Sequence, residues 1–545
     1  MARVAAIGLD AGEWQLIEPM LADGQLPNLA AIRSKSAECR LTNPLYRSTL
    51  VWEAFVTGRQ DLDDDRSGGV EFDPLTYGVR KIAAGSAAPF YAGLAGVEAI
   101  AFDVPHLSVA GAANDVRVCT WGAHSRSHPR ASNPPELLGE IDRVFGLHPA
   151  FRDEHRYAWH RPEFVEWLVR SLVAGSATRG DIAAWLMDRF PSWQLFLTVM
   201  SESHSAGENL GHALAEGHPL ARLPLARCHR TELLEVYRAM DAAIGRFAAR
   251  LPGDAALVVF SIHGTAANDS ELSSTVLLPE LLQRLHFKRP FLHEPDRAAW
   301  QRDGDAIVPL VDESWEDYMR RHVGIPTVGL RQRVRRLIPD RLVCVARSLL
   351  RGLSDNDSEL SDSDSGASLE WQVPTWFRAR WPRMKVFALP TFADARLRLN
   401  VRGRERDGIV DPADYELVCR ETEEAIRACR DPRTGRCVVA KTWRPRAAAP
   451  MAPRGCDADI VVQWSHAFDA LEHPEAGLIG PFPFRRTGGH TAGGFAFFAG
   501  AGIAPGDLGE WRAIDLPATL VALLGRPLPS HLDGRPIPVL CDAAT

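Results

Sequence analysis

The sequence predicts an α/β fold: a doubly wound, mostly parallel sheet flanked by helices, with an inserted cap region. Strands, polar sites and helices alternate along the chain, which is the pattern of open α/β sheets. At 545 residues the chain is too long for one simple core, so we expect a large domain interrupted by a sizeable insertion. The composition, with 46% hydrophobic and 24% charged residues, is typical of a globular protein.

The charge and the cysteines narrow the classes of partner. The net charge of −7 and the pI near 6.2 leave no basic footprint for nucleic acid. Nine cysteines without a C-x-x-C pair favour reduced thiols in a cytosol over a disulfide framework. We find no run of about 18 apolar residues that would span a membrane, and no room for a signal peptide before the first strand. We therefore expect a cytoplasmic protein with no nucleic-acid or membrane partner; its oligomeric state is left open.

The first predicted strand, residues 3–9, ends at Asp10. Helical stretches follow between residues 14 and 32, broken at Gly24 and Pro27. In an open α/β sheet the functional groups lie at the carboxyl ends of the strands, where Asp10 stands. A lone Asp after a strand is more commonly an N-cap or a turn residue.

The next stretch, residues 43–59, delivers two adjacent hydroxyls to the start of a helix-compatible run that stops at Gly58. These hydroxyls belong to Ser48 and Thr49. A hydroxyl at that place meets unpaired backbone N–H groups at the positive end of the helix dipole. It can cap the helix, or it can attack an anion bound there. The stretch alone leaves both interpretations open.

Residues 61–155 are irregular, and His124 within them is either a hydrogen-bonded loop histidine or a contact to substrate. Helical periodicity returns at 162–174 and 179–189 and precedes a strand at 194–200. That strand ends in a dense polar cluster, which favours a metal or catalytic role over a solvated loop. The carboxylates and imidazoles of the cluster are Glu202, His204, Glu208 and His212.

A helix over 231–250 leads to a third buried strand, 255–262, which closes on His263. Asn268 follows and is either a turn residue or a contact to substrate. From about residue 275 to 450 the composition changes to stretches rich in arginine and tryptophan. An acidic low-complexity run at 353–368 predicts a disordered loop.

Strand-like texture resumes at 458–464, and His490 lies among four glycines before an apolar run at 495–500. Glycines at such a place indicate close approach of the backbone to a ligand. A helix over 514–524 closes the domain. We therefore expect an α/β core built from residues 1–274 and 451–545, with residues 275–450 as the insertion or cap.

In chain order, the polar groups at the strand ends resemble the alkaline phosphatase superfamily, especially its type I phosphodiesterase/nucleotide pyrophosphatase branch. Several separated blocks carry the resemblance over most of the chain. They are Ile7-Gly8-Leu9-Asp10, Leu26-Pro27-Asn28-Leu29, Ser48 four residues before Trp52, Asn400-Val401-Arg402-Gly403-Arg404-Glu405, Gly489-His490 and Leu532-Asp533-Gly534.

The resemblance implies that Ser48 is the nucleophile and that one or two nearby divalent metal ions, usually zinc, activate it. The candidate metal ligands are Asp10, His204, Glu208, His263 and His490, with Glu202 and His212 as further donors in the same cluster. The candidate contacts to substrate are Thr49, His124, Asn268, Arg402 and Arg404. Surface salt bridges are the alternative for the two arginines.

The sequence departs from the family's pattern at two motifs. The usual Asp-x-x-x-His reads His204 to Glu208, and the usual Asp-His-Gly reads Ile262-His263-Gly264. An isoleucine cannot bind a metal, so one carboxylate ligand is missing. We expect a rearranged site with one or two ions, and the alternative is a metal-poor site that uses His and Arg for charge stabilisation.

The predicted function is that of a metal-dependent hydrolase, a phosphodiesterase or sulfatase-like enzyme. It would cleave a small-molecule phosphate or sulfate ester through a covalent Ser48 intermediate. One alternative is a transferase that moves the phosphoryl or sulfuryl group to a small-molecule acceptor in specialised metabolism. A second alternative is a non-catalytic binding protein on the same scaffold.

Overall fold

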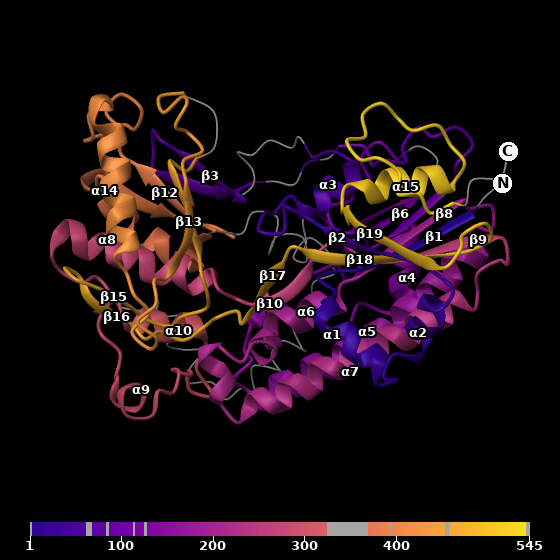
Figure 1. Cartoon of the computed structure of the whole chain (residues 1–545), viewed down its shortest axis with the longest axis horizontal. Helices are drawn as coiled ribbons and strands as arrows, with labels where there is room; N and C mark the ends of the chain where they lie inside the picture. Colours follow the sequence, from indigo (N-terminus) through magenta and orange to yellow (C-terminus); the bar gives the residue numbers. More distant parts are fainter. Residues whose placement is uncertain are drawn as a thin grey trace, which may run out of the picture.

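The computed structural model shows two lobes, with a short two-stranded ribbon lying between them (Figure 1). The structure describes residues 3–60, 68–82, 85, 87–112, 115–124, 128–323, 369–392, 394–452 and 457–540. The acidic run at 353–368 lies outside these residues.

The larger lobe is built on a mostly parallel sheet, which has nine strands in the described part of the chain. Their order across the sheet is β19 (Gly506–Arg512), β2 (Ala37–Thr42), β18 (Gly493–Ala499), β9 (Ala255–Ser261), β1 (Arg3–Leu9), β8 (Leu195–Met200), β5 (Ala99–Phe102), β6 (Val116–Cys119) and β7 (Ala131–Asn133). Strand β1 lies at the centre and pairs in parallel with β8 and β9, whereas β18 runs antiparallel to both its neighbours. The three predicted strands at 3–9, 194–200 and 255–262 are thus adjacent.

Helices cover both faces of this sheet. One face carries α1 (Trp14–Ala22), α2 (Pro27–Arg33), α4 (Leu137–Phe145), α5 (Pro162–Arg189), α6 (Glu202–Leu210) and α7 (Leu225–Ala248), and the other carries α3 (Val51–Thr57) and α15 (Asp515–Leu523). In β1, Ala5 and Ile7 pack against the first group of helices, while Val4 and Ala6 pack in the core with α3 and α15. A central strand buried on both faces is apolar throughout, which explains the continuous apolar runs.

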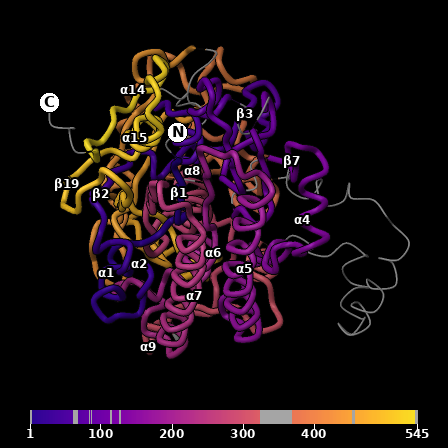
Figure 2. Tube along the Cα trace, turned by 90° about the vertical axis from the view of Figure 1, so that its right-hand side faces the viewer, coloured from indigo at the N-terminus to yellow at the C-terminus, as the bar shows by residue number. Residues whose placement is uncertain are grey.

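Two parts of the larger lobe differ from the sequence prediction. The helices expected at 162–174 and 179–189 are one helix, α5, which runs beside α7 (Figure 2). The polar side chains at its middle are satisfied within the helix, since Ser176 donates to the Leu172 carbonyl and Thr178 to the Ala174 carbonyl. The stretch 61–155, expected to be irregular, contains β3 (Val70–Asp73), β4 (Gly78–Lys81) and the strands β5 to β7 at one side of the sheet.

The smaller lobe is built on an antiparallel sheet of order β11 (Val386–Leu389), β12 (Ala395–Leu399), β14 (Ile460–Trp464) and β13 (Val439–Trp443). Helices α8 (Leu278–Phe287), α9 (Ala298–Asp303), α10 (Trp315–Arg321) and α14 (Tyr415–Arg427) and the hairpin of β15 (Leu471–His473) and β16 (Gly477–Ile479) complete it.

The boundary of the cap differs from the one expected at residue 450. Strand β14 pairs with β12 and β13 of the smaller lobe, and the apolar core of that lobe extends to Phe484. The hairpin β3–β4 also packs there, through Phe72 and Tyr77. A buried strand has the same apolar texture in either sheet, so the sequence pattern does not tell which sheet it joins.

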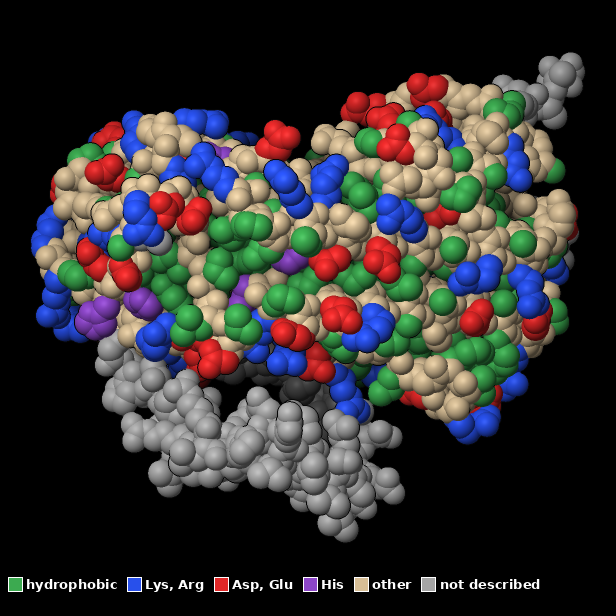
Figure 3. Space-filling view, turned by 90° about the horizontal axis from the view of Figure 1, so that it is seen from below, with side chains coloured by type: hydrophobic (Ala, Val, Ile, Leu, Met, Phe, Trp, Pro, Cys, Tyr) green, Lys and Arg blue, Asp and Glu red, His purple; other side chains and the backbone are tan. Residues whose placement is uncertain are grey.

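The ribbon between the lobes pairs β10 (Gly264–Ala267) with β17 (Gly488–Thr491) in antiparallel fashion. Basic and acidic side chains are intermixed over the face seen in Figure 3.

Within the described ranges, no helix combines the length and the apolar character that a bilayer crossing requires.

Candidate metal centre and active site

Asp10 lies at the carboxyl end of β1 and is completely buried. One carboxylate oxygen accepts a hydrogen bond of 2.7 Å from the indole N–H of Trp52, in the first turn of α3. The other lies 2.9 Å from Nδ1 of His204, in the first turn of α6. Burial alone would raise the pKa of Asp10, but His204, His263 and Trp52 hold it below its usual range. The carboxylate is therefore charged and orients His204.

Three imidazoles meet beside Asp10: those of His204, His263 and His490, whose ligand atoms all lie within 4.8 Å of one another. His490 reaches this point from β17, and its Nε2 lies 3.0 Å from Nε2 of His204. Neither ring nitrogen of the fully buried His263 has a hydrogen-bond partner among the residues that the structure describes. Burial lowers the pKa of His263 to about 4, so its imidazole is neutral.

This triad fits a divalent ion. Three imidazole nitrogens are a ligand set that zinc takes in catalytic sites, with a further position for water or substrate. A metal-bound histidine commonly gives its other N–H to a carboxylate, as His204 does to Asp10. The orphaned nitrogens of His263 are costly to bury unless something binds them.

Glu208 lies one turn after His204 on α6 and is held by several donors. Its Oε2 accepts from the Tyr157 hydroxyl at 2.6 Å and lies 2.9 Å from Nε2 of His124, and its Oε1 pairs with the guanidinium of Arg486. Burial alone would raise the pKa of Glu208, but Arg486 and His124 hold it well below the usual range. His124 thus contacts Glu208, one turn after His204; its contact to substrate stays a prediction.

Two further groups of side chains near His124 could hold a metal ion by residue type and distance. They are His124 with His204 and Glu208, and His124 with Glu154 and His155. Burial alone would lower the pKa of His124, but Glu208 and Glu154 raise it to about 10. Tyr157, Glu154, His155 and Arg486 were missed in the sequence. The pair Arg485-Arg486, four residues before His490, is a signal that was present.

Ser48 is half-buried in the loop before α3, and its hydroxyl accepts a hydrogen bond of 3.1 Å from the Leu50 amide. The helix itself begins at Val51 and ends at Gly58, whose φ of 68° suits glycine. The indole of Trp52 ties the start of this helix to Asp10. Ser48 therefore lies in the loop that leads into the helix whose Trp52 contacts Asp10.

Arg47 and Thr49, on either side of Ser48, face the parts of the chain around the smaller lobe. The guanidinium of Arg47 pairs with Asp394 at 2.8 Å and also with Asp269. A Cβ added at Gly69 would lie 2.8 Å from the methyl group of Thr49. The loop that carries Ser48 is thus held from both lobes.

Glu202 and His212 belong to none of the metal-binding groups found among the described residues. Glu202 is completely buried with Arg179 at 3.1 Å and His148 at 3.3 Å. His212 has its Nε2 3.0 Å from Nδ1 of His229, away from the triad. Both residues were expected to be metal donors. In the structure Glu202 instead forms a buried ion pair with Arg179, and His212 lies beside His229.

Three predicted contacts to substrate have other partners. Asn268 donates to the Gly488 carbonyl at 3.0 Å and accepts from two backbone amides, as a turn residue does. Arg402 is exposed and pairs with Asp411 at 3.1 Å. Arg404 is buried against Asp459 at 2.7 Å. The two arginines follow the salt-bridge alternative.

Ile262, the residue before His263, has no exposed surface and packs in the same apolar cluster as Phe55 and Phe260. It also lines a small cavity beneath the loop of Ser48, together with Leu45, Val51 and Phe55. Where the family's motif has a carboxylate, this protein has an apolar contact.

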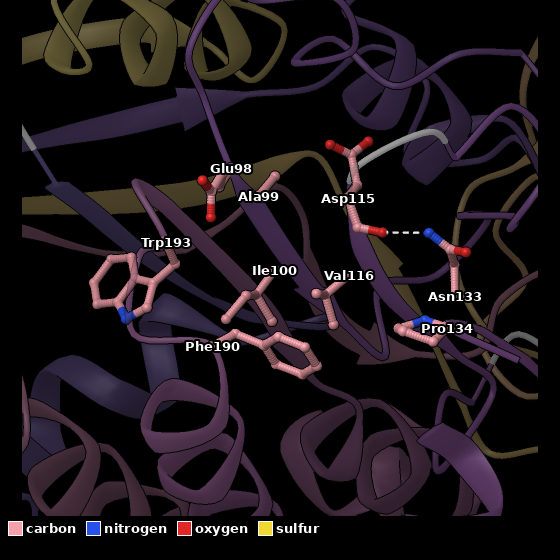
Figure 4. Close-up of a pocket in the computed structure, with 9 residues that line it drawn as sticks. All are labelled: Glu98, Ala99, Ile100, Asp115, Val116, Asn133, Pro134, Phe190 and Trp193. Carbon is pink, nitrogen blue, oxygen red and sulfur yellow. Dashed lines mark hydrogen bonds between the residues drawn. The ribbon is translucent and has the colours of Figure 1, made fainter. Parts of the chain in front are cut away.

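A separate groove lies at the opposite edge of the sheet, at the amino ends of β5 and β6 (Figure 4). It is lined by Glu98, Ala99, Ile100, Asp115, Val116, Asn133, Pro134, Phe190 and Trp193. In open α/β sheets the functional groups lie at the carboxyl ends of the strands, where the histidine triad is.

The fold is similar to that of alkaline phosphatase in solved structures. Wild-type alkaline phosphatase PafA superposes with a TM-score of 0.50 at 9% identity, over 99% of both chains. Phosphonoacetate hydrolase from Sinorhizobium meliloti gives 0.41 at 12% identity over 96% of both chains. Human ectonucleotide pyrophosphatase/phosphodiesterase 5 gives 0.41 at 11% identity, over 98% of this chain and 97% of that one. No family model and no curated protein matches the sequence.

Proposed function

We propose that this protein is a cytoplasmic, metal-dependent enzyme that cleaves a small-molecule phosphate or sulfate ester through a covalent intermediate on Ser48. The observation that carries the proposal is the triad of buried His204 and His263 with half-buried His490, with Asp10 behind it and no hydrogen-bond partner for His263 within the described chain. We take Zn²⁺ as the resident ion because the ligands are imidazoles. The six cysteines that the structure describes are free thiols, which suits a reducing compartment.

The chemistry that a divalent ion supplies when bound here is polarisation of an ester oxygen and a lowered pKa for a neighbouring hydroxyl. Asp10 holds His204 so that Nδ1–H donates to the carboxylate and the lone pair of Nε2 faces the other two imidazoles. Trp52 fixes the start of α3, and with it the loop of Ser48, against the same carboxylate.

Ser48 would attack the phosphorus or sulfur atom, so that a bond forms to its Oγ as the bond to the leaving oxygen breaks. Its proton passes to solvent water, and the leaving oxygen takes up a proton from solvent water, so that the step releases the alcohol. Water then cleaves the seryl ester and restores the hydroxyl. His124 lies next to His204, with ring centroids 4.1 Å apart.

The test is release of p-nitrophenol from its phosphate monoester, its phosphate diester and its sulfate ester by metal-loaded protein. We expect Ser48→Ala to lower turnover by about 10³-fold or more, since a covalent path is lost. Ser34→Ala, at an exposed hydroxyl before the amino end of β2, is the control and should keep the activity. No turnover of any ester, together with no adduct on Ser48 by mass spectrometry, would refute the proposal.

Transfer to a small-molecule acceptor instead of water is the second candidate. It is favoured by Ile262, whose apolar contacts replace a carboxylate that would help to activate water. Mass spectrometry of reactions that contain donor and acceptor separates the two. Hydrolysis without an acceptor product would exclude the transferase.

A further inference from the structure

Arg486 lies between two carboxylates beside the histidine triad. Its Nη1 pairs with Oε1 of Glu208, and its Nε lies 3.0 Å from Oε2 of Glu271. The same Oε1 of Glu208 is 3.5 Å from Nε2 of His204, so the guanidinium stands next to a ligand of the predicted ion. The side chain of Arg486 is 17% exposed and that of Glu208 only 4%. The pair is therefore shielded from water and weakly screened by salt.

The group His124, His204 and Glu208 has residue types that could hold a second ion, but its donor atoms are engaged. Glu208 uses both oxygens, for Arg486 on one side and for His124 and Tyr157 on the other. His124 uses both ring nitrogens, since Nε2 faces Glu208 and Nδ1 lies 3.0 Å from the Ser205 hydroxyl. This contrasts with His263, whose nitrogens find no partner in the part of the chain that is described.

A second ion would also meet repulsion. A divalent cation beside Glu208 would stand close to the fixed positive charge of Arg486, which burial does not remove because arginine stays protonated.

We propose that the site holds a single divalent ion, at His204, His263 and His490, and that the guanidinium of Arg486 occupies the place of a second one. The inference rests on the proposed function in so far as it takes this site as the ester-cleaving centre. The two carboxylates that bracket Arg486 fix its position, so the second positive charge is built into the chain.

The experiment is a count of bound metal. Protein loaded with excess Zn²⁺ and passed through a desalting column is measured for zinc per chain by mass spectrometry of the metal. We expect one ion per chain in the native protein and none in His263→Ala. Arg486→Met should raise the ratio to two, because it removes the charge that repels a second ion and frees Oε1 of Glu208, whose other oxygen lies beside His124.

Arg485→Met is the matched control. Arg485 pairs with Glu271 and Glu316 but makes no ion pair with Glu208 within the described chain, so its loss should leave one ion per chain. Titration with Co²⁺, followed by its visible absorption, gives a second count: saturation at one equivalent in the native protein and at two in Arg486→Met.

Two ions per native chain would overturn the proposal, and so would a ratio of one in a folded Arg486→Met protein. If Arg486→Met does not fold, the count in the native protein and in Arg486→Lys, which keeps the charge, still decides. Ester assays on the same samples separate this inference from the function. One ion without any turnover refutes the function and leaves the ion count; two ions with turnover refute the ion count alone.

Discussion

His263 is the residue that most constrains the chemistry of this site. A buried polar group without a hydrogen-bond partner costs about 1–3 kcal/mol of stability, and both ring nitrogens of His263 lack one among the described residues. Its low pKa keeps it neutral, which is the form that binds metal. The simplest physical account of these unpaired nitrogens is that His263 binds a metal ion together with His204 and His490.

Asp10 should act on metal affinity through His204. Asp10→Asn keeps the shape of the side chain but weakens the hydrogen bond that orients the imidazole. We expect zinc affinity to fall by about 10- to 100-fold, as for other carboxylates behind a metal-bound histidine. Competition with a chromophoric chelator measures this. An unchanged affinity would show that Asp10 does not support the ion, and complete loss would indicate direct ligation.

Arg179 should act on stability and not on metal. It pairs with Glu202 at 3.1 Å and Asp103 at 2.8 Å, and none of the three is more than 2% exposed. Arg179→Met would leave two buried carboxylates without their cation, which costs about 3–5 kcal/mol. Urea unfolding measures the loss. The zinc content of the folded fraction should equal that of the native protein, and its disappearance would argue that Glu202 belongs to the metal site.

The sequence predicted which strand-end residues lie together better than it predicted which side chains of the 202–212 cluster face them. Asp10, His204, His263 and His490 were expected together and do lie together. Glu202 was grouped with His204 because both follow one strand. In a helix, residues two apart point to different faces and residues four apart share one. Since α6 begins at Glu202, His204 and Glu208 face the site while Glu202 faces Arg179.

At the scale of elements, the ribbon of β10 and β17 places His490 against α6. The backbone of β17 approaches α6 so closely that a Cβ at Gly488 would lie 1.9 Å from the carbonyl oxygen of Gly207. The glycines around His490 thus serve contact between elements. The sequence had indicated close approach of the backbone there, and the partner in the structure is helix α6.

Gly488→Ala should therefore displace His490 from the triad. The added methyl group meets backbone, which cannot move aside cheaply, so β17 must shift away from α6. We expect a large loss of zinc affinity, together with a loss of stability of about 1–3 kcal/mol. Gly493→Ala is the matched control, because a Cβ there has no neighbour within 4 Å in the described structure. Equal zinc affinity in both variants would contradict this role for the ribbon.

The elements that the sequence predicted well are long or buried on both faces. Strands β1, β8 and β9 are continuous apolar runs, and α15 is strongly apolar. The short strands β5 to β7 were missed because three or four residues carry too little periodicity. The membership of β14 in the smaller sheet depends on contacts distant in sequence, which a local pattern does not contain.

At the scale of the whole molecule, a cluster of three buried histidines lies close to residues that join the lobes. His212, His218 and His229 come from the turns after α6 and from α7. The ring of His218 lies 4.4 Å from that of Phe484, at the end of the smaller lobe's core, and the ring of His212 lies 5.4 Å from that of Trp159. Protonation of these imidazoles would put charge into an apolar junction.

Acidification should therefore destabilise the protein through this cluster. Burial lowers the pKa of His218 to about 3 and that of His229 to about 4, against about 6.5 in an unfolded chain. Between pH 6.5 and 4 the unfolded state binds protons that the folded state does not. The free energy of unfolding then falls as pH falls, by up to about 1.4 kcal/mol per pH unit for each histidine. Urea unfolding at pH 7, 6 and 5 measures the slope. His229→Gln should make it shallower by up to that amount, and a slope equal to that of the native protein would exclude His229 as a source of acid sensitivity.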